Sequence, residues 1–243
     1  MTSAIIFDFN GVLVDDEEVH FELFRKLLAE EGVAITLDDY HNRYLGYDDR
    51  GCFAAALGDN GQAFDSARLD ELIARKAQRY VTVAENGLRF FPDAAETLEM
   101  LAAVWPIAIC SGALRSEIEY ALRRLGCRDC IASIVAAEDA HRCKPDPSGY
   151  QQALNALRRT IGKKSPAAPM LSPHQCLVVE DSLAGIMSAK AAGMRAVGIT
   201  HTYTEAQLLQ SGADAIVHDL QTLRADWIKQ QLSLNADADL SST

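Results

Sequence analysis

Long hydrophobic runs are scarce in this 243-residue chain, although 49% of its residues are hydrophobic. The apolar stretches are short and are broken by charged residues, and none approaches the roughly 20 apolar residues of a membrane-spanning helix. A strand-like segment begins within a few residues of the N-terminus, which is not the pattern of a secretory signal. We therefore expect a cytoplasmic protein that does not associate with membranes.

Positive charge is also in short supply. The chain carries 23 Lys and Arg residues against 34 Asp and Glu residues, which gives a formal net charge of −11. Nucleic-acid binding needs clustered cations that neutralise phosphates, so this balance argues against a nucleic-acid partner. A small phosphorylated molecule is still compatible with it, because a few local cations or a metal ion can reverse the field at one site.

Cysteines arranged as a disulfide framework are missing as well. The six cysteines are scattered through a chain large enough to fold without such bridges, which favours reduced thiols. Cys127 and Cys130 have the spacing of a metal or redox motif, but no second pair accompanies them. We interpret these two thiols as part of a helix end.

Residues 16–91 show almost no strand signal. Val19, Leu23 and Leu27 recur at helical spacing and predict an amphipathic helix that ends at Gly32. Three further helices are predicted over Leu37–Arg43, Asp48–Leu57 and Phe64–Glu85. This block is expected to form an all-helical cap domain.

The rest of the chain, residues 1–15 and 92–243, has the pattern of an α/β core. Strands are predicted where short apolar runs occur: Ala4–Phe7, Ile107–Cys110, Ser133–Ala136, Cys176–Val179, Ala196–Ile199 and Ala215–Val217. Helices are predicted between them: Asp93–Ala103, Arg115–Leu125, Pro147–Arg159 and Leu183–Ala192. This alternation predicts a doubly wound parallel sheet, with a loop over Gly162–Pro173 and an irregular tail after Leu232.

Reactive side chains stand where three of the predicted strands end. Asp8 follows the first strand, Ser111 and Gly112 follow the second, and Glu180-Asp181 follow Cys176–Val179. Lys144 lies in a proline-containing loop before a predicted helix. Because the carboxyl ends of parallel strands share one edge of a sheet, these groups are expected to converge there.

Four motifs occur in order on these elements. They are Asp8-Phe9-Asn10-Gly11-Val12-Leu13, Cys110-Ser111-Gly112, Lys144-Pro145-Asp146-Pro147 and Val179-Glu180-Asp181-Ser182. Together with the stretch from Ala184 to Met194, they resemble the haloacid dehalogenase superfamily, in its branch of beta-phosphoglucomutases and small phosphatases. The resemblance covers the chain from Ile5 to about Val217 and implies a Rossmann-like core with a helical cap.

The resemblance also implies roles for the motif residues. Asp8 would attack phosphorus and form an aspartyl phosphate, and Lys144 would neutralise the charge on the nucleophile and the transferring group. Ser111 and the backbone amides of Gly112 and Ala113 would bind phosphoryl oxygens. The expected cofactor is Mg²⁺, whose implied ligands are Asp8, the backbone carbonyl of Asn10, Asp181 and, directly or through water, Glu180.

Each of these residues alone has a simpler interpretation. A serine after a strand is usually a helix cap, and a lysine before proline is usually a solvated loop residue. Glu180 and Asp181 could cap the next helix. An acidic pair that ends a fully apolar strand would be unfavourable without a cation, however, so the combination favours a metal site.

Asn10 departs from the family pattern. The family's phosphatases and phosphomutases carry a second aspartate at this place, and it exchanges a proton with the leaving and attacking oxygens. An amide cannot do this, and general acid–base catalysis contributes about 10²–10⁴ in rate, or roughly 3–5 kcal/mol. Three explanations stay open: a phosphatase that uses Asp15, Asp16, His20 or a good leaving group, an engineered Asp-to-Asn variant, or a phosphate-binding protein without turnover.

Substrate selection is expected to lie in the cap. His20 is near the first hinge, and Leu45-Gly46-Tyr47-Asp48-Asp49-Arg50 loosely matches the family's specificity loop, where Arg50 could reach a second anionic group. Arg115 is another candidate substrate contact; for all three, a solvated charge is an equally good interpretation. We expect a monomeric Mg²⁺-dependent phosphatase acting on a small phosphorylated metabolite, with a sugar phosphomutase or a phosphate-ligand-binding protein as alternatives.

Overall fold

The computed structural model describes residues 2–45, 47–140, 142–166 and 169–231. Its centre is a six-stranded sheet in the order β3-β2-β1-β4-β5-β6, and every pair of neighbouring strands is parallel. The strands are β1 (Ala4–Phe7), β2 (Ile107–Cys110), β3 (Ile131–Val135), β4 (Cys176–Glu180), β5 (Arg195–Ile199) and β6 (Ala215–Val217). The predicted parallel sheet is therefore confirmed.

Helices cover both faces of this sheet. Alternate residues of β1 point to opposite faces, so Ile5 and Phe7 enter one hydrophobic cluster while Ala4 and Ile6 enter another. The first cluster includes residues of α5 (Ala94–Ala102) and α6 (Arg115–Leu125). The second includes residues of α7 (Ser148–Lys164), α8 (Leu183–Ala191) and α9 (Glu205–Gln210). This arrangement is the doubly wound α/β fold that the sequence predicts.

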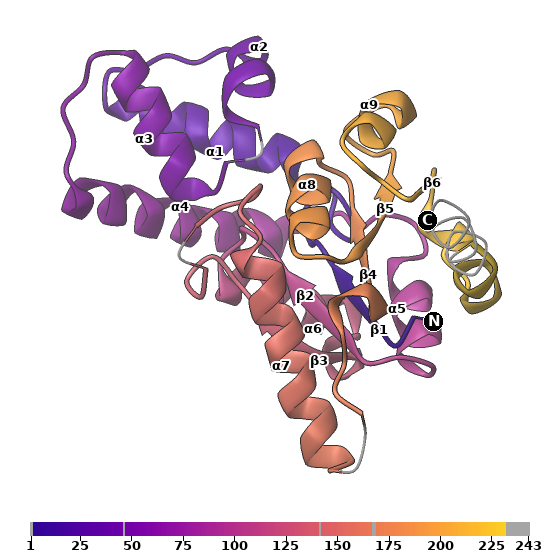
Figure 1. The fold of residues 1–243 in the computed structure, drawn as a ribbon. Helices are drawn as coiled ribbons and strands as arrows, with labels where there is room; N and C mark the ends of the chain where they lie inside the picture. Colours follow the sequence, from indigo (N-terminus) through magenta and orange to yellow (C-terminus); the bar gives the residue numbers. More distant parts are fainter. Residues whose placement is uncertain (1, 46, 141, 167–168, 232–243) are drawn as a thin grey trace.

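The helical cap follows β1. It contains α1 (Glu17–Glu30), α2 (Leu37–Asp39), the π-helical turn η1 (Tyr40–Tyr44), α3 (Asp49–Asp59) and α4 (Ser66–Gly87), seen as the purple group in Figure 1. These elements bury a hydrophobic cluster of their own, built from residues between Phe21 and Ile73. The all-helical cap is thus confirmed, and its bounds at residues 16 and 91 stay a prediction.

The two chain segments that join the cap to the core run side by side. Val14 and Phe90 form an antiparallel bridge. The amide of Asp15 donates to the carbonyl of Arg89 at 3.0 Å, and the amide of Phe91 donates to the carbonyl of Leu13 at 3.1 Å. The cap therefore enters and leaves the core at one place, beside the end of β1.

Several element bounds differ from the sequence prediction. The helix after Pro147 continues to Lys164 rather than ending at Arg159, because Leu157 and Ile161 extend its apolar face against the second cluster. The predicted helix Leu37–Arg43 is a short α-helix followed by a π-helical turn. Strand β3 begins at Ile131, and α9 has no counterpart in the prediction. The tail after Leu232 lies outside the described residues.

In the described part of the chain, we find no helix with the length and apolar character needed to cross a membrane.

Candidate active site

Asp8 and Lys144 form a buried ion pair at the sheet edge. Asp8 follows β1 and is 7% exposed. The Nζ atom of Lys144 lies 2.8 Å from Asp8 Oδ1, and the contact is an ion pair without the angles of a hydrogen bond. Burial raises the pKa of Asp8 to about 6 even though Lys144 opposes the shift. Burial disfavours the charged lysine, but Asp8 and Glu180 together raise the pKa of Lys144 above its ordinary value. The ammonium is therefore held in its charged form beside the carboxyl of Asp8.

Glu180, the last residue of β4, is fully buried and hydrogen-bonded through both carboxylate oxygens. Its Oε1 atom accepts from Lys144 Nζ and, at 2.8 Å, from the Tyr150 hydroxyl. Its Oε2 atom accepts from the amide and hydroxyl of Ser182 at 3.0 and 2.9 Å. A Cβ atom at Gly185 would lie 1.7 Å from Oε1, so only glycine leaves room for this carboxylate. The buried Glu180 carboxylate thus fixes the position of the Lys144 ammonium through a hydrogen bond.

Asp181 completes a group of three carboxylates. Oxygen atoms of Asp8, Glu180 and Asp181 lie within 4.8 Å of one another. Burial and the two neighbouring carboxylates raise the pKa of Asp181 well above its ordinary value. Because one lysine cannot balance three carboxylates, the residues fit a divalent cation that prefers oxygen ligands.

The loop after β1 passes close to Asp181. Gly11 has a φ of 72°, and a Cβ atom there would lie 2.1 Å from Asp181 Oδ2. Thr202, in the segment after β5, donates a hydrogen bond to the same oxygen. The backbone of the loop and the carboxylate are therefore held together, which suits a site that combines a backbone carbonyl with carboxylate ligands.

Ser111, Gly112 and Ala113 line the same site from the end of β2. The Ser111 hydroxyl accepts a hydrogen bond from the amide of Ala113 at 3.1 Å and lies 3.4 Å from Asn10 Oδ1. Gly112 lies beneath the cap, because a Cβ atom there would be 3.6 Å from the Cβ atom of Asp48. The turn therefore presents small residues where core and cap meet.

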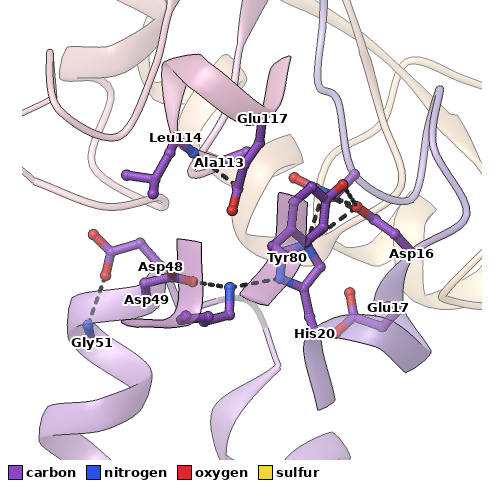
Figure 2. A network of polar contacts seen from close by, with 12 residues as sticks. Asp16, Glu17, His20, Asp48, Asp49, Gly51, Tyr80, Ala113, Leu114 and Glu117 are labelled. Carbon is purple, nitrogen blue, oxygen red and sulfur yellow. Dashed lines mark hydrogen bonds and ion pairs between the residues drawn. The ribbon is translucent and has the colours of Figure 1, made fainter. Parts of the chain in front are cut away.

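Asn10 is tied to a buried acid–histidine pair. Its Nδ2 atom donates to Asp16 Oδ1 and Oδ2 at 3.0 and 2.9 Å and lies 3.2 Å from His20 Nε2. The Tyr80 hydroxyl also donates to Asp16, at 2.6 Å (Figure 2). Burial alone would raise the pKa of Asp16, but these contacts and His20 lower it overall. Asp16 is therefore an anion that fixes the orientation of the Asn10 amide.

Lys76 lies behind His20 and is fully buried. Its Nζ atom is 2.7 Å from His20 Nδ1 and 2.5 Å from Asp49 Oδ1, and it lies 4.6 Å from the centre of the Phe24 ring. An ammonium only donates hydrogen bonds, which assigns Nδ1 as the acceptor and Nε2 as the protonated nitrogen of His20. Glu117 of α6 faces this cluster from the core side (Figure 2).

A cavity of about 150 Å³ separates the sheet edge from the cap. Asp8, Asn10, Lys144 and Asp181 line it from the core, whereas Glu180 lies behind this surface. The cap contributes Glu17, His20, Phe24, Tyr40, Leu45, Tyr47, Asp48 and Asp49. The predicted strand-end residues therefore meet the cap around one cavity.

The family model of the haloacid dehalogenase-like hydrolases matches residues 2–193. The chain belongs to this family. It is 30% identical over 226 residues to validoxylamine A 7'-phosphate phosphatase of Streptomyces hygroscopicus subsp. limoneus, covering 92% of this chain and 97% of that protein. It is 29% identical over 217 residues to a phosphorylated carbohydrates phosphatase of Thermotoga maritima, covering 88% of this chain and 93% of that protein.

A similar fold occurs in a solved member of the beta-phosphoglucomutase branch. The crystal structure of beta-phosphoglucomutase from Clostridium difficile matches with a TM-score of 0.81 at 21% identity, covering 97% of this chain and 99% of that one. The resemblance read from the four motifs is thus confirmed for the haloacid dehalogenase-like hydrolases.

Two of the predicted substrate contacts in this hydrolase lie away from the cavity. Arg50 forms an ion pair with Asp70 on α4. Arg115 pairs with Asp139 and donates to the carbonyl of Ile134 at 3.0 Å. Neither arginine is among the described residues that line the cavity. Gly46 of the predicted specificity loop lies outside the described residues.

Several cavity residues were absent from the sequence prediction. Thr202 and Tyr203 follow β5, so the strand-end reasoning that found Asp8 would also have found them. Glu17 and Tyr40 come from the cap, where the Tyr40 hydroxyl donates to Glu17. No local pattern distinguishes these two from ordinary polar helix residues.

Proposed function

We propose that the chain is a Mg²⁺-dependent phosphatase of small phosphorylated metabolites. The observation that carries the proposal is the placement of Asp8 beside the charged Lys144 in a cavity that Ser111 and Asp181 also line. A carboxylate nucleophile, a fixed cation and hydrogen-bond donors are the groups that phosphoryl transfer requires, because its catalysis is mostly positioning and electrostatic stabilisation.

In the proposed reaction, an Asp8 oxygen forms a bond to phosphorus while the bond to the leaving oxygen breaks. Water then releases phosphate from the aspartyl phosphate and regenerates the carboxylate. Lys144 stabilises negative charge on Asp8 and on the phosphoryl group, and Glu180 keeps the ammonium in place. Ser111 and the amides of Gly112 and Ala113 are proposed to hold phosphoryl oxygens.

The proposed Mg²⁺ ligands are Asp8, Asp181 and the backbone carbonyl of Asn10. When bound, the ion would supply positive charge that offsets the crowded carboxylates and the phosphoryl oxygens. Glu180 is proposed to act mainly on Lys144, because both of its oxygens already accept hydrogen bonds.

His20 is the proposed proton-exchange group in place of the missing aspartate. It lines the cavity and lies 3.2 Å from Asn10, whereas Asp16 is buried behind it. Asp15 is paired with Arg89 and does not line the described cavity.

The proposed substrate is a phosphorylated sugar or a similar polyol. Two relatives support this class by their names, one a phosphatase of validoxylamine A 7'-phosphate and one a phosphatase of phosphorylated carbohydrates. The sugar phosphomutase alternative has less support, because Arg50 is paired with Asp70 rather than placed at the cavity.

A phosphate-ligand-binding protein is the second candidate function. It is favoured by the Asn10 amide, which Asp16 holds in a fixed orientation through two hydrogen bonds and which cannot exchange a proton. Such a chain would still bind a phosphorylated ligand but would turn it over slowly or not at all.

Phosphate release with Mg²⁺ from a panel of sugar phosphates and p-nitrophenyl phosphate would test these proposals. We expect release by the chain as it stands, none by Asp8→Ala, a changed pH–rate profile for His20→Asn, and a rate about 10²–10⁴ higher for Asn10→Asp. Turnover by Asn10→Asp alone would favour the binding protein. Release that persists in Asp8→Ala would refute the proposed nucleophile.

A further inference from the structure

We propose that the cavity selects phosphomonoesters whose remaining part is neutral or carries an amine, and that it rejects substrates with a second anionic group. The inference rests on the proposed function and names the substrate class of the same site. It is argued from the acidic residues on the cavity wall and from the position of Arg50, which pairs with Asp70 instead of adding a positive charge to that wall.

The wall that the cap contributes is acidic. Among the described residues that line it, Glu17, Asp48 and Asp49 bear carboxyl groups, and no lysine or arginine is present. Figure 2 shows Asp48 and Glu17 on opposite sides of Asp49 and His20, with Leu114 of the core across from Asp48. A substrate held by its phosphoryl group on Asp8 and Lys144 would place its far end against this wall.

Two of these carboxylates contact only neutral hydrogen-bond donors. Asp48 accepts hydrogen bonds from the amide of Gly51, at 2.8 Å, and from the Cys143 thiol, and Glu17 accepts one from the Tyr40 hydroxyl. Neither forms an ion pair with another described residue, whereas Asp49 is matched by Lys76. Glu17 and Asp48 can therefore attract an ammonium or accept hydrogen bonds from hydroxyl groups, and they repel an anion.

The lysine and arginine that line the cavity stand on its core side. Lys144 belongs to the phosphoryl end, where it contacts Asp8 and Glu180. Arg142 lines the cavity from the core, but its side chain is 78% exposed and lies 3.5 Å from Asp146 Oδ2. Arg50, the cap residue best placed in sequence to receive a second phosphate, is paired with Asp70. No lysine or arginine on the described cap wall would balance a second phosphate.

Binding to a matched set of ligands tests the inference. With Mg²⁺ present, titration calorimetry would compare inorganic phosphate, glucose 6-phosphate, glucosamine 6-phosphate and glucose 1,6-bisphosphate. We expect the bisphosphate to bind roughly tenfold more weakly than either monophosphate, since it places a like charge beside two carboxylates. Glu17→Gln and Asp48→Asn together should bring the ratio to within about threefold, because they remove charge but keep shape.

Glu22→Gln is the control, because Glu22 lies on the exposed side of α1 and pairs with Arg25. It should leave the ratio as in the parent chain. An unchanged affinity for inorganic phosphate shows that the double variant keeps its site. The inference is wrong if the parent chain binds the bisphosphate as tightly as glucose 6-phosphate. It is also wrong if the double variant leaves the ratio of these two Kd values unchanged; the proposed function would stand in either case. If the parent chain does not bind inorganic phosphate in the presence of Mg²⁺, the proposed function is wrong as well.

Discussion

Replacing the buried lysine of the cap, Lys76→Met, should destabilise the protein strongly. Lys76 is fully buried, with its Nζ atom 2.5 Å from Asp49 Oδ1 and 2.7 Å from His20 Nδ1. Methionine fills a similar volume over the Phe24 ring but leaves the charge of Asp49 without its cation, and Asp49 Oδ2 already has no hydrogen-bond partner. Breaking a buried pair in this way costs about 3–5 kcal/mol.

Thermal unfolding followed by circular dichroism would measure the effect. For chains of this size, 1 kcal/mol shifts Tm by about 2–4 °C, so the variant should melt roughly 6–20 °C below the parent. Adding Asp49→Asn to Lys76→Met should recover at least about 1 kcal/mol, because the unpaired charge is then gone.

Lys26→Met is the matched control, since Lys26 is 60% exposed and lies 4.0 Å from its partner Glu22. Its effect should stay within about 0.5 kcal/mol. If Lys76→Met melts within 2 °C of Lys26→Met, or if Asp49→Asn brings no recovery, the buried charges are not balanced as described here.

Three further predictions concern the site. Mg²⁺ at about 100 times its Kd should stabilise the protein by about 2.7 kcal/mol, measured as a rise in Tm. If Mg²⁺ raises the Tm of Asp181→Asn by the same amount, the proposed ligand set is wrong. Gly11→Ala should abolish this Mg²⁺ effect, because its Cβ atom would lie 2.1 Å from Asp181 Oδ2. Gly32→Ala has a similar positive φ but no atom within 4 Å, so its Mg²⁺ effect should persist. The folded structure lowers the pKa of Asp16 below its ordinary value of 3.8. Ionised Asp16 therefore stabilises the fold at pH values above 3.8, and this stabilisation is lost as the pH falls through the pKa of the folded state. Asp16→Asn should therefore flatten the acid side of a stability–pH curve, and an unchanged curve would contradict the assignment.

The sequence alone determined the fold class and much of the placement of the candidate site. Apolar runs without polar alternation predict strands covered on both faces, and parallel strands bring their carboxyl ends to one edge. Asp8, Ser111 and Asp181 therefore had to approach one another once the strands were identified. The helical cap could also be predicted from the sequence, since its helices have apolar residues at helical spacing.

Only the tertiary structure decided how the charged side chains pair. His20 and Lys76 are separated by 56 positions, and nothing in the local pattern around Lys76 distinguishes a buried ammonium from a solvated one. The same holds for Arg50, which pairs with Asp70 across the cap instead of facing the cavity. Periodicity reports which face of a helix is apolar, whereas the direction of a long polar side chain depends on partners supplied by distant segments. The acidic character of the cavity wall therefore emerges only when cap and core are packed together.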